Sequence, residues 1–221
     1  MEEKVPEAIG NAIASAAAAD PNDGAAINAL GLLAWHGKGG YDEDHGEAAQ
    51  LFRRASNLGY APAQVNTADM TYNGEGGLIV DKGEAARLYS LAAEQGNLVA
   101  AVHLAHMLLL GDGVDADPAR ARALLEDAAG HGDPDACYHL GVMHYHGNAA
   151  AGLRAPDKAR AARLLRVAAN GNDPDAQRAL AKMYELGEGG LEMDLEEAEI
   201  LETAADNDGE FEHEQSFHNK K

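Results

Sequence analysis

The sequence predicts an all-α fold, an α-solenoid of about five helix-turn-helix repeats. Three observations predict it. A helix-start signal recurs, a glycine follows at a fixed distance after one position that can be aligned in every copy, and the pattern A-x-x-L-[LFY]-x-x-A recurs. Self-similarity with a period of about 20 to 50 residues is typical of repeat proteins. The five copies align, at intervals of 37, 37, 36 and 40 residues, on Leu30, Thr67, Leu104, Leu140 and Leu180.

The first helix of a repeat begins at a clear signal in two copies. The sequence reads DPDA at residues 133–136 and again at 173–176. An aspartate at the N-cap accepts a hydrogen bond from a free backbone N–H of the first turn. Proline suits the first helical position because its missing N–H would have no helical partner there. Asp133 and Asp173 are therefore predicted N-caps.

A glycine seven residues after each aligned position is predicted to end the first helix, because glycine accepts the positive φ of a helix C-terminus. These glycines are Gly37, Gly74, Gly111, Gly147 and Gly187. The second helix follows, with apolar residues spaced three and four apart, which indicates one buried face. Units are predicted to close at Gly59, Gly96, Gly132, Asn172 and Gly209.

The stretches AARLYSLAAEQGNLVAAVHLA and LGLLAWHGKG resemble Sel-1-like repeats, a variant of the tetratricopeptide family. The resemblance covers about residues 22 to 209. It implies a right-handed superhelix whose concave face is lined mainly by the first helix of each pair. Three residues depart from the family pattern: Thr67 replaces a leucine, Ala149 replaces the second loop glycine of the fourth repeat, and Glu202 replaces an apolar residue.

We expect the chain to have three parts. Residues 1–21 form an N-terminal capping helix, residues 22–209 form the Sel-1-like repeat solenoid, and residues 210–221 form an acidic tail that is either flexible or a partial cap helix. A repeat array has no single core, since each unit contacts only its neighbours. We therefore expect one continuous array.

Composition fits this fold class. Hydrophobic residues make up 46% of the chain but aromatic residues only 5%, which predicts a core of alanine and leucine. The one cysteine, Cys137, excludes an internal disulfide framework and fits a reducing compartment. The sequence has no apolar run long enough for a membrane span, and MEEKVPEAIG is acidic where a signal peptide is basic. We expect a cytoplasmic rather than a secreted protein.

The formal net charge of −20 limits the class of partner. Nucleic acid and anionic membranes both require basic protein surface, so we expect neither nucleic-acid binding nor membrane insertion. A basic protein or peptide is the better candidate. The alternative is that the acidic surface only keeps the repeat array soluble.

The tetratricopeptide resemblance implies which side chains line the concave face. The positions that it places there carry large aromatic residues among polar ones, a composition typical of protein-recognition surfaces. The alternative is that each aromatic ring packs against the next repeat, in which case full burial would exclude it from binding. The predicted partner-binding residues are Trp35, His36, Asp69, Tyr72, Asn73, His106, Tyr138, Tyr145, His146, Arg178 and Lys182.

The sequence gives no support for catalysis. It contains no G-x-S-x-G, no H-E-x-x-H and no glycine-rich phosphate loop followed by lysine. The histidines of HLAHM and HLGVMHYH complete no standard set of metal ligands. We therefore expect no enzyme activity, no cofactor and no metal.

Two functional hypotheses remain open. In the first, the chain is an adaptor or scaffold that binds a peptide or partner protein through its concave face. In the second, it is a structural or regulatory subunit of a multiprotein complex that docks through its outer acidic surface and its termini.

Overall fold

The computed structural model describes the backbone of residues 5–218 and the side chains through residue 207. In this range the chain is helical, with a single isolated β-bridge between Asn148 and Leu153 and no β-sheet. The helices are α1 (Glu7–Ala19), α2 (Gly24–His36), α3 (His45–Asn57), α4 (Ala61–Asn73), α5 (Lys82–Glu94), α6 (Leu98–Leu110), α7 (Pro118–Gly130), α8 (Pro134–His146), α9 (Lys158–Asn170), α10 (Pro174–Leu186) and α11 (Leu195–His218).

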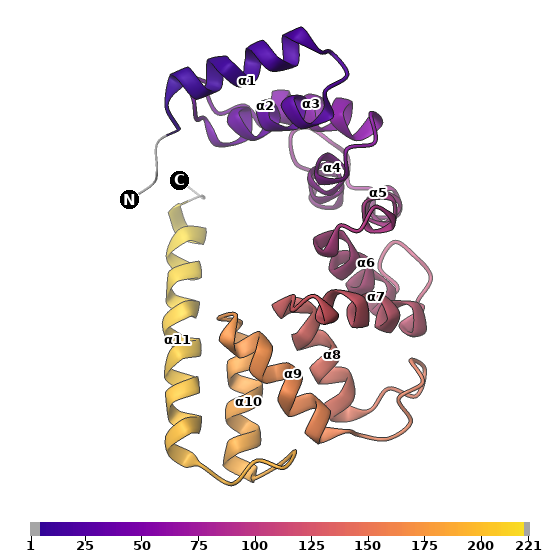
Figure 1. The fold of residues 1–221 in the computed structure, drawn as a ribbon, viewed down its shortest axis with the longest axis vertical. Helices are drawn as coiled ribbons and strands as arrows, with labels where there is room; N and C mark the ends of the chain where they lie inside the picture. The colour runs from indigo at the N-terminus through magenta and orange to yellow at the C-terminus, as the bar shows by residue number, and fades with distance from the viewer. Residues whose placement is uncertain (1–4, 219–221) are drawn as a thin grey trace. The chain divides into compact units, whose positions relative to one another are not determined.

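The chain divides into two compact units, Met1–Ala116 and Asp117–Lys221. In the first unit each of the helices α1 to α6 packs against the next one along the chain, and in the second unit α7 to α11 do the same (Figure 1). The first helices of the five repeats are α2, α4, α6, α8 and α10. The second helices are α3, α5, α7, α9 and α11. The predicted all-α architecture is confirmed.

The predicted helix signals have the expected geometry. The Asp133 carboxylate accepts a hydrogen bond from the Ala136 N–H at 2.9 Å, and the Asp173 carboxylate accepts one from the Ala176 N–H at 2.7 Å. Each predicted terminal glycine is the C-cap of a first helix and has a positive φ. Asn172 replaces a closing glycine and has a φ of 63°, the one positive value at a non-glycine residue within 5–218.

Small residues let the two helices of a repeat approach closely. Gly31 follows the aligned Leu30, and a Cβ atom on Gly31 would lie 2.6 Å from the ring of Phe52. Gly141 has the same place against Leu165, where a Cβ would lie 3.0 Å from the side chain. The core around these contacts is largely alanine, as the composition predicts.

Consecutive repeats interlock through a second loop glycine, nine residues after the aligned position. Its backbone lies against the first residue of the preceding repeat's second helix, so closely that an added Cβ would be at most 2.5 Å from that residue. The pairs are Gly76 with His45, Gly113 with Lys82, and Gly189 with Lys158. The fourth repeat has Ala149 at this position, and its loop takes a different course.

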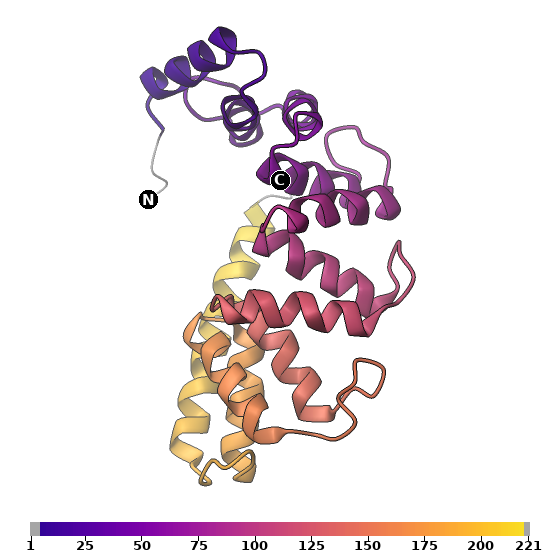
Figure 2. The ribbon, with the colours of Figure 1, turned by 45° about the vertical axis from the view of Figure 1, so that its right-hand side comes forward.

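The loop between α8 and α9 is longer than its counterparts and has its own small turn. The Asn148 carboxamide accepts a hydrogen bond from the Ala151 N–H at 3.0 Å, and the Leu153 N–H donates to the Asn148 carbonyl at 2.8 Å. Ala151 is buried, and the loop extends past the ends of the helices (Figure 2). The extra residues therefore form a turn of their own, with Ala151 buried.

The C-terminal helix is longer than the sequence indicated. Helix α11 continues through Gly209 to His218, so Gly209 does not end it. The division into 1–21, 22–209 and 210–221 stays a prediction, and residues 1–4 and 219–221 of its outer parts lie outside the described residues. None of the helices in the described part is both long and apolar enough to cross a bilayer.

Candidate functional site

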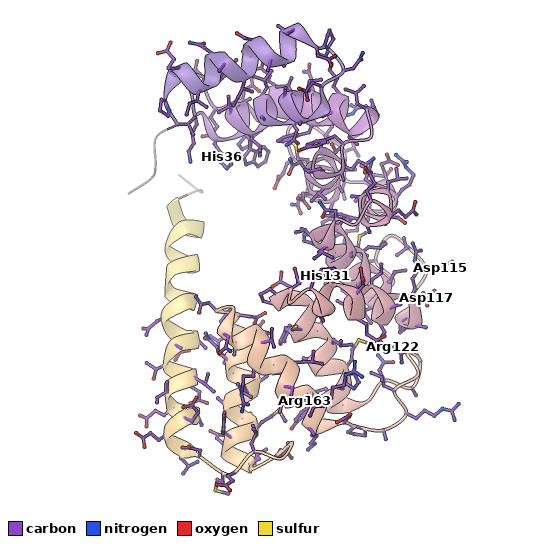
Figure 3. All side chains as sticks on the ribbon, in the orientation of Figure 1. His36, Asp115, Asp117, Arg122, His131 and Arg163 are labelled. Carbon is purple, nitrogen blue, oxygen red and sulfur yellow. The ribbon has the colours of Figure 1, made fainter. Side chains whose placement is uncertain are left out.

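Two adjoining hollows lie along the first helices of the first unit. The α2–α4 hollow has a volume of about 250 Å³, and its lining includes Trp35, His36, Asp69 and Glu75. The α4–α6 hollow has a volume of about 300 Å³ and is lined in part by Asp69, Tyr72, Asn73 and His106. Asp69 lines both hollows. Figure 3 labels His36, which is the last residue of α2.

The second unit has a smaller hollow between α8 and α10. Its volume is about 150 Å³, and Tyr145, His146 and Lys182 lie in its lining, beside Val142 and Leu165. The same face of the repeat, the one formed by first helices, is therefore hollowed in both units.

Nine of the eleven predicted partner-binding residues line one of these three hollows, and Tyr138 and Arg178 do not. Arg178 instead contacts Asp175 and Asp206, at 3.4 and 3.5 Å, and Tyr138 lies against the His139 ring. None of the eleven side chains is fully buried. Their role in binding stays a prediction.

The Tyr72 hydroxyl is engaged inside the protein. It donates a hydrogen bond to Asp112 Oδ2 at 2.7 Å, and Lys82 Nζ lies 2.8 and 2.9 Å from the two oxygens of the same carboxylate. The Lys82 ammonium also lies 4.7 Å from the centre of the Tyr72 ring, within cation–π range. We call this arrangement the tyrosine–lysine–acid cluster.

The second unit repeats the cluster with other residues. Tyr145 donates to Glu188 at 2.7 Å, Lys158 pairs with the same carboxylate at 2.5 Å, and the Lys158 ammonium lies 4.8 Å from the Tyr145 ring centre. The lysine, and after it the tyrosine hydroxyl, lowers the pKa of the acid by hydrogen bonding. The pKa of Asp112 is lowered by the same two causes in the same order. Each cluster joins two consecutive repeats.

Sequence reasoning missed the lysine and the acid of both clusters. It placed Tyr72 and Tyr145 on a binding surface, and both do line a hollow, but it did not predict that their hydroxyls also hold neighbouring repeats together or that a lysine lies over each ring. One signal was available. In both clusters the lysine begins a second helix and the acid lies 30 residues further on, eight after the next aligned position: Lys82 with Asp112, and Lys158 with Glu188.

The first repeat has different residues at the same three places. Trp35 replaces the tyrosine, and His45 replaces the lysine and stacks on the indole with a centroid distance of 3.9 Å and an interplanar angle of 13°. His45 Nε2 lies 3.2 Å from Glu43. Glu75 replaces the acid and lines the α2–α4 hollow, and its side chain makes no hydrogen bond or ion pair with another described residue.

Asp69, which lines both hollows of the first unit, is held in place by a hydrogen bond from a buried tyrosine. Tyr89, which is 3% exposed, donates a hydrogen bond from its hydroxyl to Asp69 Oδ1. Burial is the main cause of a raised pKa at Tyr89, and the bond to Asp69 is the next. The His103 ring stacks on Tyr89 with centroids 5.1 Å apart. The tyrosine therefore stays protonated and orients the carboxylate between the two hollows.

The histidine-rich stretches do not form a metal centre in the described part of the chain. There, no three His, Cys, Asp or Glu side chains come together in a way that could hold a metal ion. His144 is instead buried in the second unit, with its Nε2 atom unpartnered among the described residues.

The repeats match a known family. A family model of the Sel1 repeat matches residues 24–60, 61–97, 98–133, 134–173 and 174–201, which is most of the chain. The chain belongs to the Sel1 repeat family. Each matched segment contains one of the five aligned positions, so the predicted Sel1 repeat register is confirmed.

Solved Sel1 repeat structures have a similar fold. A Sel1 repeat protein from Oxalobacter formigenes is 26% identical with a TM-score of 0.75, over 90% of this chain and 76% of that one. A putative Sel1 repeat protein from Klebsiella pneumoniae is 21% identical with a TM-score of 0.55, over 95% and 98% of the two chains. The protective antigen c5321 of uropathogenic Escherichia coli is 25% identical with a TM-score of 0.50, over 87% and 48%.

A comparison with curated proteins gave no match. The family and the structural similarity identify the fold as an all-α solenoid of Sel1 repeats, a class of scaffold that mediates protein interactions and is typically not enzymatic.

Proposed function

We propose that this Sel1 repeat protein is an adaptor that binds a peptide, or a segment of a partner protein, along the face formed by its first helices. The observation that carries the proposal is the pair of adjoining hollows in the first unit, which share Asp69. Two hollows side by side suit successive side chains of an extended segment. Aromatic and polar groups line both of them, as in protein-recognition surfaces.

The charge of the hollows favours a basic segment. Asp69 and Glu75 bring two carboxylates to the α2–α4 hollow, and the whole chain has a formal charge of −20. A field of this sign attracts basic partners and speeds their association, most strongly at low ionic strength. Binding by this route should therefore weaken as salt is added.

The alternative function has its own support. Helix α11 exposes a series of carboxylates, and a partner could dock on this outer acidic surface while the hollows stay empty. In that case the protein would be a structural or regulatory subunit of a complex. The exposed acidic residues of α11 are Glu196, Glu199, Glu202 and Asp206.

Peptide selection with the full chain tests the proposal. Peptides selected from a displayed random library are synthesised, and their affinity is measured by calorimetry. We expect the double variant Trp35→Ala with Asn73→Ala, one change in each hollow, to weaken binding at least about tenfold, as interface hot spots do. Val99→Ala, at an exposed residue that lines neither hollow, is the control. Tyr72→Ala is unsuitable because it would also remove a cluster that joins two repeats.

Two results would contradict the proposal. One is that the double variant binds the selected peptides as well as the parent chain does. The other is that binding responds only to charge reversal on α11, with Glu199→Lys and Glu202→Lys, which would support the alternative.

A further inference from the structure

We propose that the α2–α4 hollow takes up a cationic side chain, an arginine or a lysine, from the bound segment. The inference rests on the proposed function and narrows its partner to a segment with a basic residue at one defined place. Three features of the first unit support it: an acid with no side-chain partner among the described residues, an aromatic side chain beside it, and an apolar wall.

The acid is Glu75. At the equivalent places in two other junctions, Asp112 and Glu188 each have a lysine of the chain itself as their partner. Glu75 has no such lysine, because His45 begins the second helix here and its ring is held between Trp35 and Glu43. The first junction therefore has the acid of the cluster without its cation.

The aromatic side chain is Trp35. In the two complete clusters an ammonium group lies 4.7 and 4.8 Å from the centre of a tyrosine ring. Trp35 has the place of that tyrosine and lines the hollow together with Glu75. Tryptophan is the strongest of the aromatic side chains in cation–π contacts. The His45 ring already covers one face of the indole, at the place that the lysine has in the two clusters, so a guest cation would contact the part of Trp35 that lines the hollow.

The walls of the hollow suit the stem of a long basic side chain. Phe52 and Met70 are almost completely buried beneath the hollow, and Leu32 is 40% exposed beside it. The methylene groups of lysine and arginine pack on such apolar surface while the charged end meets polar groups. Asp69, oriented by Tyr89, adds a second carboxylate for the charged end.

The charges facing the hollow favour the positive guest. Among its lining residues the acids are Asp69 and Glu75, and His36 is the one basic side chain. His45 and Glu43 lie next to Trp35 as a pair. The volume of about 250 Å³ is enough for one side chain rather than for a folded element.

Trp35 provides a direct readout because it is the only tryptophan in the chain. The probes are acetyl-Gly-Arg-Gly-amide, its lysine analogue, and its citrulline analogue, which keeps the shape of arginine without the charge. Each is titrated into the full chain at pH 8 while the indole fluorescence and the indole N–H resonance are followed. We expect a saturable change with the arginine and lysine probes, and at least about tenfold weaker binding of the citrulline probe, the cost of one charge-assisted contact.

A matched pair of variants separates the site from the overall charge. Glu75→Gln should weaken binding of the arginine probe about tenfold. Asp115→Asn removes the same unit of charge far from the hollow and should change the affinity for this probe less than about twofold. Asp115 is exposed in the loop that follows α6 in the same unit (Figure 3). Both variants are near-isosteric changes at side chains that are not buried, so both should fold like the parent chain.

Three results would overturn the inference: equal binding of the citrulline and arginine probes, no effect of Glu75→Gln, or no response of Trp35 to the charged probes. Failure here is distinguishable from failure of the proposed function. If display-selected peptides depend on Trp35 and Asn73 but tolerate loss of every basic residue, the adaptor function stands and the cation site does not exist. If no peptide depends on either hollow, both proposals fail.

Discussion

The Tyr145 hydroxyl donates a hydrogen bond to Glu188 at 2.7 Å, across the junction between the fourth and fifth Sel1 repeats. The second and third repeats are joined in the same way, by Tyr72 and Asp112. Both acids also pair with a lysine that begins a second helix. These two junctions therefore have polar clusters in addition to their apolar contacts, and substitutions in a cluster can measure how much it strengthens its junction.

Removal of the Tyr145 hydroxyl should weaken its junction. We expect Tyr145→Phe to lower the free energy of unfolding by about 1 kcal/mol, the usual net value of one hydrogen bond, because the ring stays and the hydroxyl is lost. Urea unfolding followed by circular dichroism measures the change. Tyr138→Phe is the control, since the Tyr138 hydroxyl makes no hydrogen bond with the described residues. Equal losses in the two variants would contradict a role of the cluster in stability.

The interlocking loop glycine gives a second prediction. Gly76 and Gly77 both have positive φ, 59° and 77°, but a Cβ on Gly76 would lie 2.4 Å from the His45 carbonyl oxygen, whereas Gly77 has no atom within 4 Å. Gly77→Ala should cost only the backbone strain, about 1 kcal/mol. Gly76→Ala should cost a further 1 to 3 kcal/mol, approximately, because the loop must move away from α3. Thermal unfolding of both variants checks the difference, and equal melting temperatures would show that the contact is unimportant.

The clusters should make stability sensitive to acid. Hydrogen bonds from the lysine and then the tyrosine lower the pKa of Asp112 and of Glu188 below their ordinary values. Each carboxylate therefore contributes stability that is complete above its unfolded-state pKa, about 4, and is lost as the pH falls through the lower folded-state value. We expect Asp112→Asn with Glu188→Gln to flatten the fall in stability below about pH 4.5. Denaturant unfolding at a series of pH values measures the slope, and an unchanged slope would refute this account.

The buried His144 should make the stability of the protein depend on pH near neutrality as well. Its side chain is 4% exposed, and burial, followed by the nearby Arg160, lowers the pKa of the imidazole. Asp157 acts in the opposite direction to a smaller extent. Since the folded state resists protonation, the stability that His144 contributes is complete above the unfolded-state pKa of about 6.5 and declines as the pH falls toward the lower folded-state pKa.

Substitution of His144 tests this dependence. Two charged groups face the imidazole from α7. Arg122, labelled in Figure 3, lowers the pKa of the imidazole, and Glu126 raises it. We expect His144→Leu to lose less stability than the parent chain between about pH 7.5 and 5.5, because the leucine has no proton to gain. His131→Gln, at an exposed histidine of the same unit, is the control for the removal of a histidine.

The periodic residues could be predicted from the sequence because their chemistry is local. An N-cap aspartate such as Asp133 acts on a backbone N–H three residues away, and a terminal glycine acts at its own position. Gly209 was misjudged for a related reason. A single glycine within a helix costs only about 1 kcal/mol, so it weakens a helix without ending it.

The clusters could not be predicted in this way. Asp112 and Glu188 look like ordinary loop charges, and their partners lie 30 to 43 residues away. Which side chains these two acids contact depends on how one repeat packs on the next in three dimensions. The hollows along the first helices, by contrast, contain most of the residues that the family resemblance implied, although Glu75 and Tyr89 were not among them.

The shared clusters also bear on how such arrays can change through recombination. The tyrosine and the lysine lie within one repeat, and the acid is always supplied by its neighbour. An exchange that moves a complete repeat keeps the first two together and needs only an aspartate or glutamate in the recipient's following loop. A crossover inside the loop between the two helices of a repeat would separate the tyrosine from the lysine. The recombinant protein would then have a weaker junction between these repeats.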